Sequence, residues 1–297
     1  MSSNFRCIRW AVDLYQWKPS IQELSLAISC IQLEEKERLM KFVFQEDFYS
    51  SLVGRLLMRK FVKSVTNISY EKIHFERDEN GKPFLTNNLD ETQHLSFNVS
   101  HQGRYSILAG IFHNKVGSSA TPLNCEDVHV GVDVMKIEYS GGKSISEFFR
   151  IMNRNFSEDE WKLIKKSSNE LNQLRLFMRH WCLKESYVKN IGIGIKIDLK
   201  KISFNIKSEE ADPNKIHTNT ELSVNGSLLD NWKFEEHTLD EYYCAAIAFK
   251  NWNKEIKSEP FVILSCAELL ENCVPLVEAD ETYCQEILNK ECKVKRK

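Results

Sequence analysis

Trp181-Cys182-Leu183-Lys184-Glu185-Ser186-Tyr187-Val188-Lys189 carries the strongest pattern in this sequence of 297 residues. In a helix, Trp181, Glu185 and Lys189 fall at i, i+4 and i+8, so they share one face. The carboxylate on such a face can bind a divalent metal or accept a proton, and the ammonium can neutralise a phosphate. The same spacing also describes an exposed Glu–Lys pair, which stabilises a helix by a few tenths of a kcal/mol. The neighbouring aromatic residues indicate a helix that is not fully solvated.

A second acid lies in Gly131-Val132-Asp133-Val134-Met135. Burying a carboxylate in an apolar strand is costly unless it is paired or bound to a metal, although an Asp can also mark the end of a strand in a surface turn. Together, Asp133 and Glu185 would suit one Mg²⁺, which usually takes one or two protein carboxylates with phosphate oxygens and water. Such a site fits pyrophosphate chemistry.

The segment Asn98-Val99-Ser100-His101-Gln102-Gly103 carries a hydroxyl next to an imidazole. A hydrolase pair of nucleophile and base is unfavourable here, because adjacent residues of an extended chain point to opposite faces. A strand-to-turn segment that offers a hydroxyl, an imidazole and backbone amides to a phosphate fits the pattern better than that pair. A structural histidine at a turn is the alternative.

The segment Arg77-Asp78-Glu79-Asn80-Gly81-Lys82-Pro83-Phe84 contains Asn80-Gly81, a strong signal for the turn of a hairpin. Arg77 and Lys82 flank that turn, so two cations can project near one loop. A hairpin needs no further function. As a clamp for phosphate or adenine, the same pair would supply a bidentate fork and a point charge.

Short segments rich in β-branched or aromatic residues alternate irregularly with helical patterns, which predicts an α+β fold. The expected strands are Cys7–Val12, Lys72–Glu76, Leu95–Val99, Tyr105–Ile111, His129–Val134, Lys201–Ile206 and Tyr242–Phe249. The expected helices cover Glu34–Lys63, as one helix or two, a segment from Ser157 and Leu171–Ile191. Ser157 through Glu160 form a capping box, a purely structural helix start.

The two halves of the chain show a weak internal similarity, in which a long helix leads to a strand and then to a second strand ending in small residues. This pattern predicts two α+β halves related by a pseudo-twofold axis with a ligand cleft between them, and common α+β patterning would also produce it. We expect an N-terminal half at 1–125, a C-terminal half at 126–252 with the metal-site residues, and a partly ordered extension at 253–297. The segment 113–127 is expected to be a surface loop.

The composition narrows the class of protein. A net charge of −2 argues against nucleic acid as the main partner, and no apolar run is long enough for a transmembrane helix. The nine cysteines form no CxxC pair, and the N-terminal residues do not look like a secretory signal. We expect a cytosolic protein with free thiols, monomeric and bound to no membrane. The basic end 293–297 is either a nuclear signal or a solvated tail.

Taken in order, these segments resemble the surfactin-type 4′-phosphopantetheinyl transferases. The resemblance is carried by Gly81-Lys82-Pro83, Asn98-Val99-Ser100-His101, Gly131-Val132-Asp133, Phe156 through Trp161, and Trp181 through Lys189. The Trp-x-x-Lys-Glu-(Ser/Ala)-x-x-Lys pattern after Gly-(Val/Ile)-Asp is its most specific part. The match runs from about Arg9 to Lys250.

The resemblance implies two similar halves with coenzyme A and Mg²⁺ between them. It implies that Asp133 and Glu185 bind the metal, and that Asp133, Glu185 and Lys189 form the catalytic set. Positions implied to bind coenzyme A are Arg38, Arg77, Asp78, Glu79, Asn80, Gly81, Lys82, Asn98, Val99, Ser100, His101, Asp133, Glu185 and Lys189.

The implied reaction transfers phosphopantetheine from coenzyme A to a serine of an apo acyl-carrier or peptidyl-carrier domain and releases 3′,5′-ADP. Carriers of a fatty acid synthase and of an aminoadipate reductase are expected from the resemblance alone. Many bacterial members have a second acid where this chain has Met135, and a thioether is a poor ligand for a hard cation. Gln102 is our candidate to replace that acid. A non-catalytic module that binds coenzyme A or a carrier is the alternative, and a scaffold with an incidental cleft is a third interpretation.

Overall fold

The computed structural model describes residues 5–114, 128–139, 141–192, 194, 197–208, 212–252 and 256–293. The strands are β1 (Phe5–Asp13), β2 (Phe75–Arg77), β3 (Pro83–Leu85), β4 (Gln93–Gln102), β5 (Tyr105–Asn114), β6 (His129–Lys136), β7 (Ile202–Asn205), β8 (Glu221–Val224), β9 (Ser227–Leu229), β10 (Trp232–Asp240), β11 (Tyr243–Lys250) and β12 (Val262–Leu264). The α-helices are α1 (Ile21–Ser29), α2 (Leu33–Met40), α3 (Gln45–Val65), α4 (Ile145–Ile151), α5 (Glu158–Ile164), α6 (Glu170–Ile191), α7 (Cys266–Leu270) and α8 (Glu281–Leu288).

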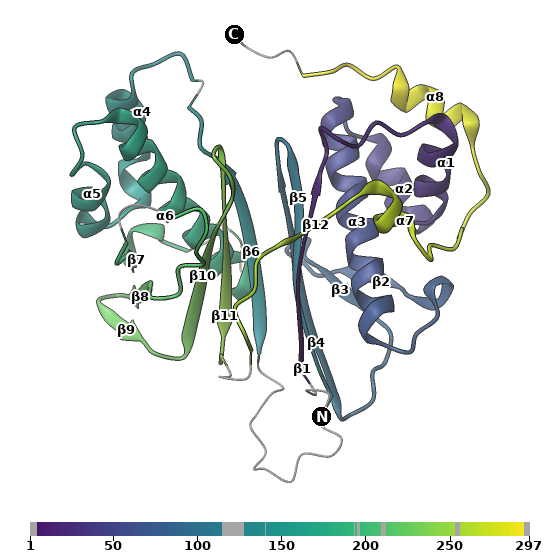
Figure 1. The fold of residues 1–297 in the computed structure, drawn as a ribbon, viewed down its shortest axis with the longest axis horizontal. Helices are drawn as coiled ribbons and strands as arrows, with labels where there is room; N and C mark the ends of the chain where they lie inside the picture. Colours follow the sequence, from purple (N-terminus) through teal and green to yellow (C-terminus); the bar gives the residue numbers. More distant parts are fainter. Residues whose placement is uncertain are drawn as a thin grey trace.

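Two sheets face each other at the centre of the molecule, with helices on the outer side of each (Figure 1). One sheet has the order β12-β1-β5-β4 and the other the order β10-β11-β6. Between them lies an apolar layer that includes Ile107 and Ile111 from β5, Val132 from β6 and Ile247 from β11. The predicted α+β class is therefore confirmed. No helix in the described ranges is long and apolar enough to cross a membrane.

Each sheet has its own core on its outer face. Phe61 of α3 is fully buried against the first sheet, and Phe177 of α6 is buried between that helix and the aromatic rings of Phe149 in α4 and Trp161 in α5. The predicted helical region Glu34–Lys63 is two helices, α2 and α3, and the segment from Ser157 forms α5 with the expected capping box. The pseudo-twofold relation between the halves stays a prediction.

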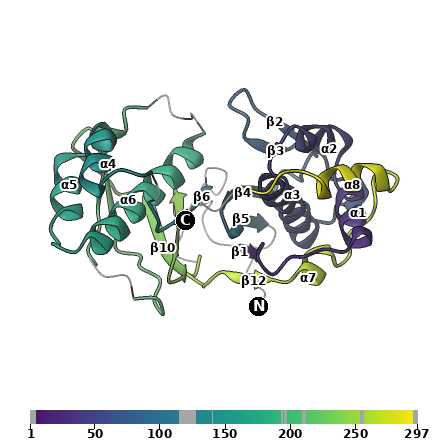
Figure 2. The ribbon, with the colours of Figure 1, turned by 90° about the horizontal axis from the view of Figure 1, so that it is seen from above.

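The C-terminal segment returns to the first half of the chain. β12 pairs in parallel with β1, and α7 and α8 lie beside α1 and α3 (Figure 2). The side chains of Leu269 and Ile287 are fully buried there. The region predicted as a partly ordered extension thus adds one strand and two helices to the N-terminal half, while the predicted boundaries at 125 and 252 stay predictions. Most of the expected loop, 115–127, lies outside the described residues.

Side chains of β4 reach the edge of β6 that β11 leaves unpaired. Because side chains alternate along a strand, every second residue of β4 points to β6. The acceptors are the side-chain oxygens of Ser96, Asn98 and Gln102, and the donors are the backbone amides of Val130 (3.0 Å), Val132 (3.0 Å) and Lys136. This side-chain seam joins the two sheets and fixes β4 against β6.

Two local features fix α6 behind β6. Gly131 has no Cβ, and an added Cβ would lie 2.5 Å from the Asn190 nitrogen, so the strand and the helix pack backbone to backbone. The fully buried Lys184 forms an ion pair of 2.9 Å with Glu160 of α5 and donates to the Leu199 carbonyl. Glu160 also accepts from the Phe204 amide at 3.0 Å. These contacts set the height and rotation of the helix that carries Glu185 and Lys189.

Candidate functional site

Ser100 of β4 and Lys189 of α6 both bind Asp133 of β6 through their side chains. The Asp133 carboxylate faces α6, and only 4% of the residue is exposed. Its Oδ1 accepts from Ser100 Oγ at 2.8 Å and from Lys189 Nζ at 2.6 Å, and Lys189 Nζ also lies 2.7 Å from Ser100 Oγ. Of the two interpretations that the sequence left open for this acid, the structure shows the buried and paired one, and its partners are Ser100 and the lysine of the helix motif.

The second oxygen of Asp133 is the unusual atom of this site. Oδ2 is buried and has no hydrogen-bond partner among the residues that the structure describes. Leaving a charged oxygen buried without a partner costs several kcal/mol by order of magnitude. An oxygen of this kind is what a hard cation such as Mg²⁺ takes as a ligand, so the observed carboxylate fits a metal site.

Glu185 lies one helical turn before Lys189 and is half-buried. Burial and then the negative charge of Asp133 raise the pKa of Glu185 above its ordinary value, against the opposing effect of Lys189. Burial and a neighbouring negative charge both disfavour the ionised form of a carboxyl group.

Among the residues that the structure describes, no third acid joins Asp133 and Glu185. Within the described ranges, no group of three or more His, Cys, Asp and Glu side chains could hold a metal ion. Met135 packs against the apolar core of the second half, and Gln102 accepts a hydrogen bond from the Lys136 amide through its side-chain oxygen. That contact engages the oxygen that Gln102 would offer to a metal, so the structure favours a structural role for this residue.

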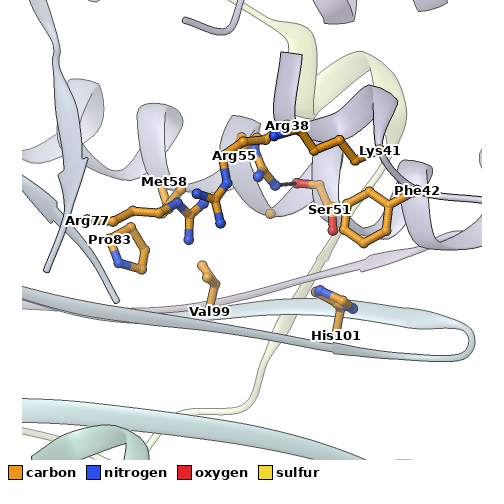
Figure 3. Close-up of a pocket in the computed structure, with 11 residues that line it drawn as sticks. Arg38, Lys41, Phe42, Ser51, Arg55, Met58, Arg77, Pro83, Val99 and His101 are labelled. Carbon is orange, nitrogen blue, oxygen red and sulfur yellow. Dashed lines mark hydrogen bonds between the residues drawn. The ribbon is translucent and has the colours of Figure 1, made fainter. Parts of the chain in front are cut away.

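A cavity of about 580 Å³ lies beside this cluster, between α2, α3 and the outer face of β4 (Figure 3). Its volume is in the range of about 300–1,000 Å³ found for small-molecule sites. The lining residues are Arg38, Lys41, Phe42, Ser51, Gly54, Arg55, Met58, Arg77, Pro83, Val99 and His101. Arginine and lysine therefore dominate its charged lining, which suits a ligand with several phosphate charges.

Glu35 holds two of these arginines. Arg77 donates to the Glu35 carboxylate at 2.9 and 3.0 Å, and Arg55 donates to its Oε2. Burial alone would raise the pKa of Glu35, but the guanidinium groups of Arg77 and Arg55 lower it below its ordinary value. Arg77 also donates to the Gly81 carbonyl, which ties the cavity wall to the hairpin turn.

Ser100 and His101 point to opposite faces of β4, as the sequence predicted. Ser100 faces Asp133, whereas His101 lines the cavity. Loss of solvation by the surrounding protein lowers the pKa of the His101 imidazole below its ordinary value, and the positive charge of Lys189 lowers it further. One strand thus presents a hydroxyl to the acid cluster and an imidazole to the cationic cavity.

Other predicted positions shape the site without facing the cavity. Asp78 caps the hairpin by accepting from the amides of Asn80 at 2.9 Å and Lys82 at 2.8 Å, with Gly81 at a positive φ of 82°. Glu79 is exposed in the same turn.

The ammonium of Lys82 donates to the carbonyl of Lys189 at 3.0 Å, at the end of α6, and burial lowers its pKa. Asn98 uses its side-chain oxygen on the Val132 amide. The structure therefore brings Arg38, Arg77, Val99 and His101 to the cavity, and Lys82 and Asn98 to contacts between the halves.

Sequence reasoning missed Lys41, Ser51 and Arg55 in the cavity wall. Arg38 and Lys41 lie at the C-terminal end of α2, and Ser51 and Arg55 are one turn apart on α3. The i, i+4 spacing of Ser51 and Arg55 was visible in the sequence, but the neighbouring apolar residues gave no sign that this side of the helix faces a cavity.

Comparison with known proteins agrees with these features. The model of the 4′-phosphopantetheinyl transferase N-terminal domain matches residues 15–113, and the model of the 4′-phosphopantetheinyl transferase superfamily matches residues 129–248.

Individual relatives cover almost the whole chain. The L-aminoadipate-semialdehyde dehydrogenase-phosphopantetheinyl transferase of Xenopus laevis is 36% identical over 297 residues, with 95% of this chain and 93% of the relative covered. The protein of the same name from Rattus norvegicus is 35% identical, with 93% and 89% covered. The 4′-phosphopantetheinyl transferase gsp of Aneurinibacillus migulanus is 30% identical, with 58% and 60% covered. By these matches over both halves, the chain belongs to the 4′-phosphopantetheinyl transferase superfamily, a family of transferase enzymes.

Proposed function

We propose that this enzyme transfers the 4′-phosphopantetheine group from coenzyme A to a serine of an apo carrier domain, with Mg²⁺ as cofactor and 3′,5′-ADP as the second product. The single observation that carries the proposal is Asp133 Oδ2, a buried carboxylate oxygen without a hydrogen-bond partner in the described part of the chain. Beside it stand a second acid, a lysine and a cationic cavity.

Asp133 and Glu185 would hold the metal. Lys189 and Ser100 occupy Oδ1 of Asp133, which leaves Oδ2 for the ion. When bound, Mg²⁺ would neutralise pyrophosphate charge and stabilise the leaving phosphate. Two protein carboxylates are an ordinary number for Mg²⁺, so Met135 does not exclude the site.

The side chains around the acids have distinct tasks in this proposal. The hydroxyl of the carrier serine attacks the β-phosphate of coenzyme A, so a new oxygen–phosphorus bond forms and the bond to 3′,5′-ADP breaks. Glu185 is the group that accepts the hydroxyl proton in this proposal. Lys189, 29% exposed, neutralises negative charge on the phosphates while it stays hydrogen-bonded to Asp133 and Ser100.

The cavity would hold the nucleotide part of coenzyme A. Arg38, Lys41, Arg55 and Arg77 place four cations on its wall, and Glu35 is the acid bound to two of them. Guanidinium groups bind phosphate oxygens bidentately, which suits a 3′-phosphate next to a pyrophosphate. The imidazole of His101 and the side chain of Phe42 offer flat surfaces for the adenine.

The carrier is expected to be an apo acyl-carrier or peptidyl-carrier domain, such as those of a fatty acid synthase or an aminoadipate reductase, since relatives carry the name of the aminoadipate-semialdehyde enzyme. We infer that the enzyme acts as a monomer in the cytosol. The alternative is a non-catalytic module that binds coenzyme A or a carrier, for which Met135 is the one argument. The intact set of Asp133, Glu185 and Lys189 favours the enzyme.

The decisive measurement is the mass of an apo carrier protein after incubation with the chain, coenzyme A and Mg²⁺. We expect the carrier to gain one phosphopantetheine group, and we expect Asp133→Ala and Glu185→Ala each to lower turnover by two or more orders of magnitude. Near-normal turnover by either variant would reject the metal assignment. Calorimetric binding of coenzyme A without any mass gain would support the non-catalytic module instead.

A further inference from the structure

A carboxylate lies among the cations of the cavity, and its place needs an explanation. Glu35 in the first turn of α2 contacts Arg55 of α3 and Arg77 of β2, so it joins three separate elements. The three side chains are largely buried, with exposed fractions of 15%, 11% and 23% respectively. An acid in a site for phosphates weakens the attraction of the site for those phosphates, so its contribution must be something other than direct attraction of the ligand.

The hydrogen bonds of the two arginines show what Glu35 does. Each guanidinium has five N–H donors in one plane. Arg77 uses three of them, two on Glu35 and one on the Gly81 carbonyl, which leaves two. Arg55 uses two, one on Glu35 and one on the Ser51 carbonyl at 2.8 Å, which leaves three. Both planes are therefore fixed, and within the described residues the remaining N–H groups are available to a ligand.

Glu35 also permits the two cations to stand together. Adjacent guanidinium groups repel each other, and Arg38 adds a third positive charge to the same cavity wall. A single carboxylate that binds both arginines offsets this repulsion and holds each one at a defined angle. Without it, the two side chains would turn apart toward solvent.

We propose that Glu35 is a positioning residue for phosphate recognition, which orients Arg55 and Arg77 on the phosphate monoester at the 3′ position of coenzyme A. Glu35 does not touch that phosphate, since two anions would repel. This inference rests on the proposed function and adds a specificity determinant to it. It assigns the discrimination between coenzyme A and 3′-dephospho-coenzyme A to the arginine pair that Glu35 orients.

The test compares Glu35→Gln with the wild-type chain on both nucleotides, with carrier phosphopantetheinylation as the readout. The glutamine side chain has nearly the same shape, but its amide nitrogen is a donor that faces guanidinium donors, so it cannot bind both arginines. We expect the KM for coenzyme A to rise about tenfold, the KM for 3′-dephospho-coenzyme A to change less than about twofold, and kcat to stay the same for both.

Glu34→Gln is the matched control. Glu34 lies in the same helical turn and is exposed, so this variant removes an equal charge without releasing an arginine. We expect it to leave both KM values unchanged. If Glu35→Gln does not fold, Glu35→Asp keeps the charge and shortens the side chain by one methylene, and the same pattern of KM values is expected.

Three results would overturn the inference: equal changes for the two nucleotides, no change for either, or a lower KM for coenzyme A because removal of a negative charge dominates. If the wild-type chain modifies no carrier at all, the proposed function fails rather than this inference. Calorimetric binding of 3′,5′-ADP and of 5′-AMP to the same variants then tests Glu35 separately. Loss of the preference for 3′,5′-ADP in Glu35→Gln alone would support the inference, and an unchanged preference would refute it.

Discussion

Gly131→Ala should disable the enzyme by moving one helix, without altering any side chain of the site. The added Cβ would lie 2.5 Å from the Asn190 nitrogen and 2.8 Å from Asn190 Cβ, and closer still to the Ser186 carbonyl oxygen. Ordinary contacts of such atoms are about 3.5 Å, so β6 and α6 must separate by about 1 Å. Because the obstacles are mainly backbone atoms, no rotamer change can relieve the clash.

Separation by that distance moves Glu185 and Lys189 away from Asp133. Misplacement of reacting groups by about 1 Å can reduce a rate about a hundredfold, and overpacking costs about 1–3 kcal/mol of stability. The assay is the turnover of carrier phosphopantetheinylation, measured at a temperature where thermal unfolding shows the variant to be folded. Gly110→Ala is the control, since its Cβ would meet the ring of Phe61 at 2.6 Å, in the other half of the molecule. We expect that control to lose stability but keep its turnover. Wild-type turnover in Gly131→Ala would refute the reasoning.

Three further predictions concern contacts between parts of the chain. Gln102→Ala should keep its affinity for Mg²⁺ and lose about 1 kcal/mol in chemical denaturation, because it removes one hydrogen bond of the side-chain seam; a large loss of metal affinity would show that Gln102 is a ligand after all. Lys82→Met should lower the free energy of unfolding by about 1.5–3 kcal/mol with an unchanged KM for coenzyme A, and a tenfold higher KM would instead place Lys82 on the nucleotide. Glu235→Gln should cost about 3–5 kcal/mol, because it leaves Arg9 buried without its partner at 2.8 Å. Burial alone would raise the pKa of Glu235, but hydrogen bonds from His237 and Arg9 lower it. The stability that the ionised pair contributes is therefore present above pH 4.5 and is lost as the pH falls through the lower pKa of the folded state. Denaturation of the variant at several pH values should show a weaker acid dependence than the wild type, and an unaltered acid dependence would contradict this assignment.

The sequence predicted the strands and helices that carry the strongest local patterns. α6, with its long amphipathic pattern, an Asn cap and Gly192 at its end, was expected within one residue at its start. The opposite orientation of Ser100 and His101 followed from strand geometry alone. Local rules succeed at these positions because spacing and alternation determine which face a side chain occupies.

Other features depend on partners distant in the sequence, and no local pattern could reveal them. Lys189 pairs with Asp133, 56 positions earlier, rather than with the acid one turn before it. Arg55 lies among apolar residues of α3, and the cavity beside it forms only because β2, β3 and β4, later in the chain, pack near this part of the helix. β12 consists of three residues, and its strand conformation comes from pairing with β1, far earlier in the chain.

The pairing of β12 with β1 has a consequence for how this protein is made. As a chain leaves the ribosome from its N-terminus, the second sheet has all its strands once Lys250 has emerged, whereas the first sheet still lacks β12 and the helices α7 and α8 that bury Leu269 and Ile287. Domains usually mature in the order of synthesis. Here the half that is synthesised first is completed last, so a nascent chain carries an exposed edge on β1 until β12 has emerged, and chaperones that bind such edges should act on it up to that point.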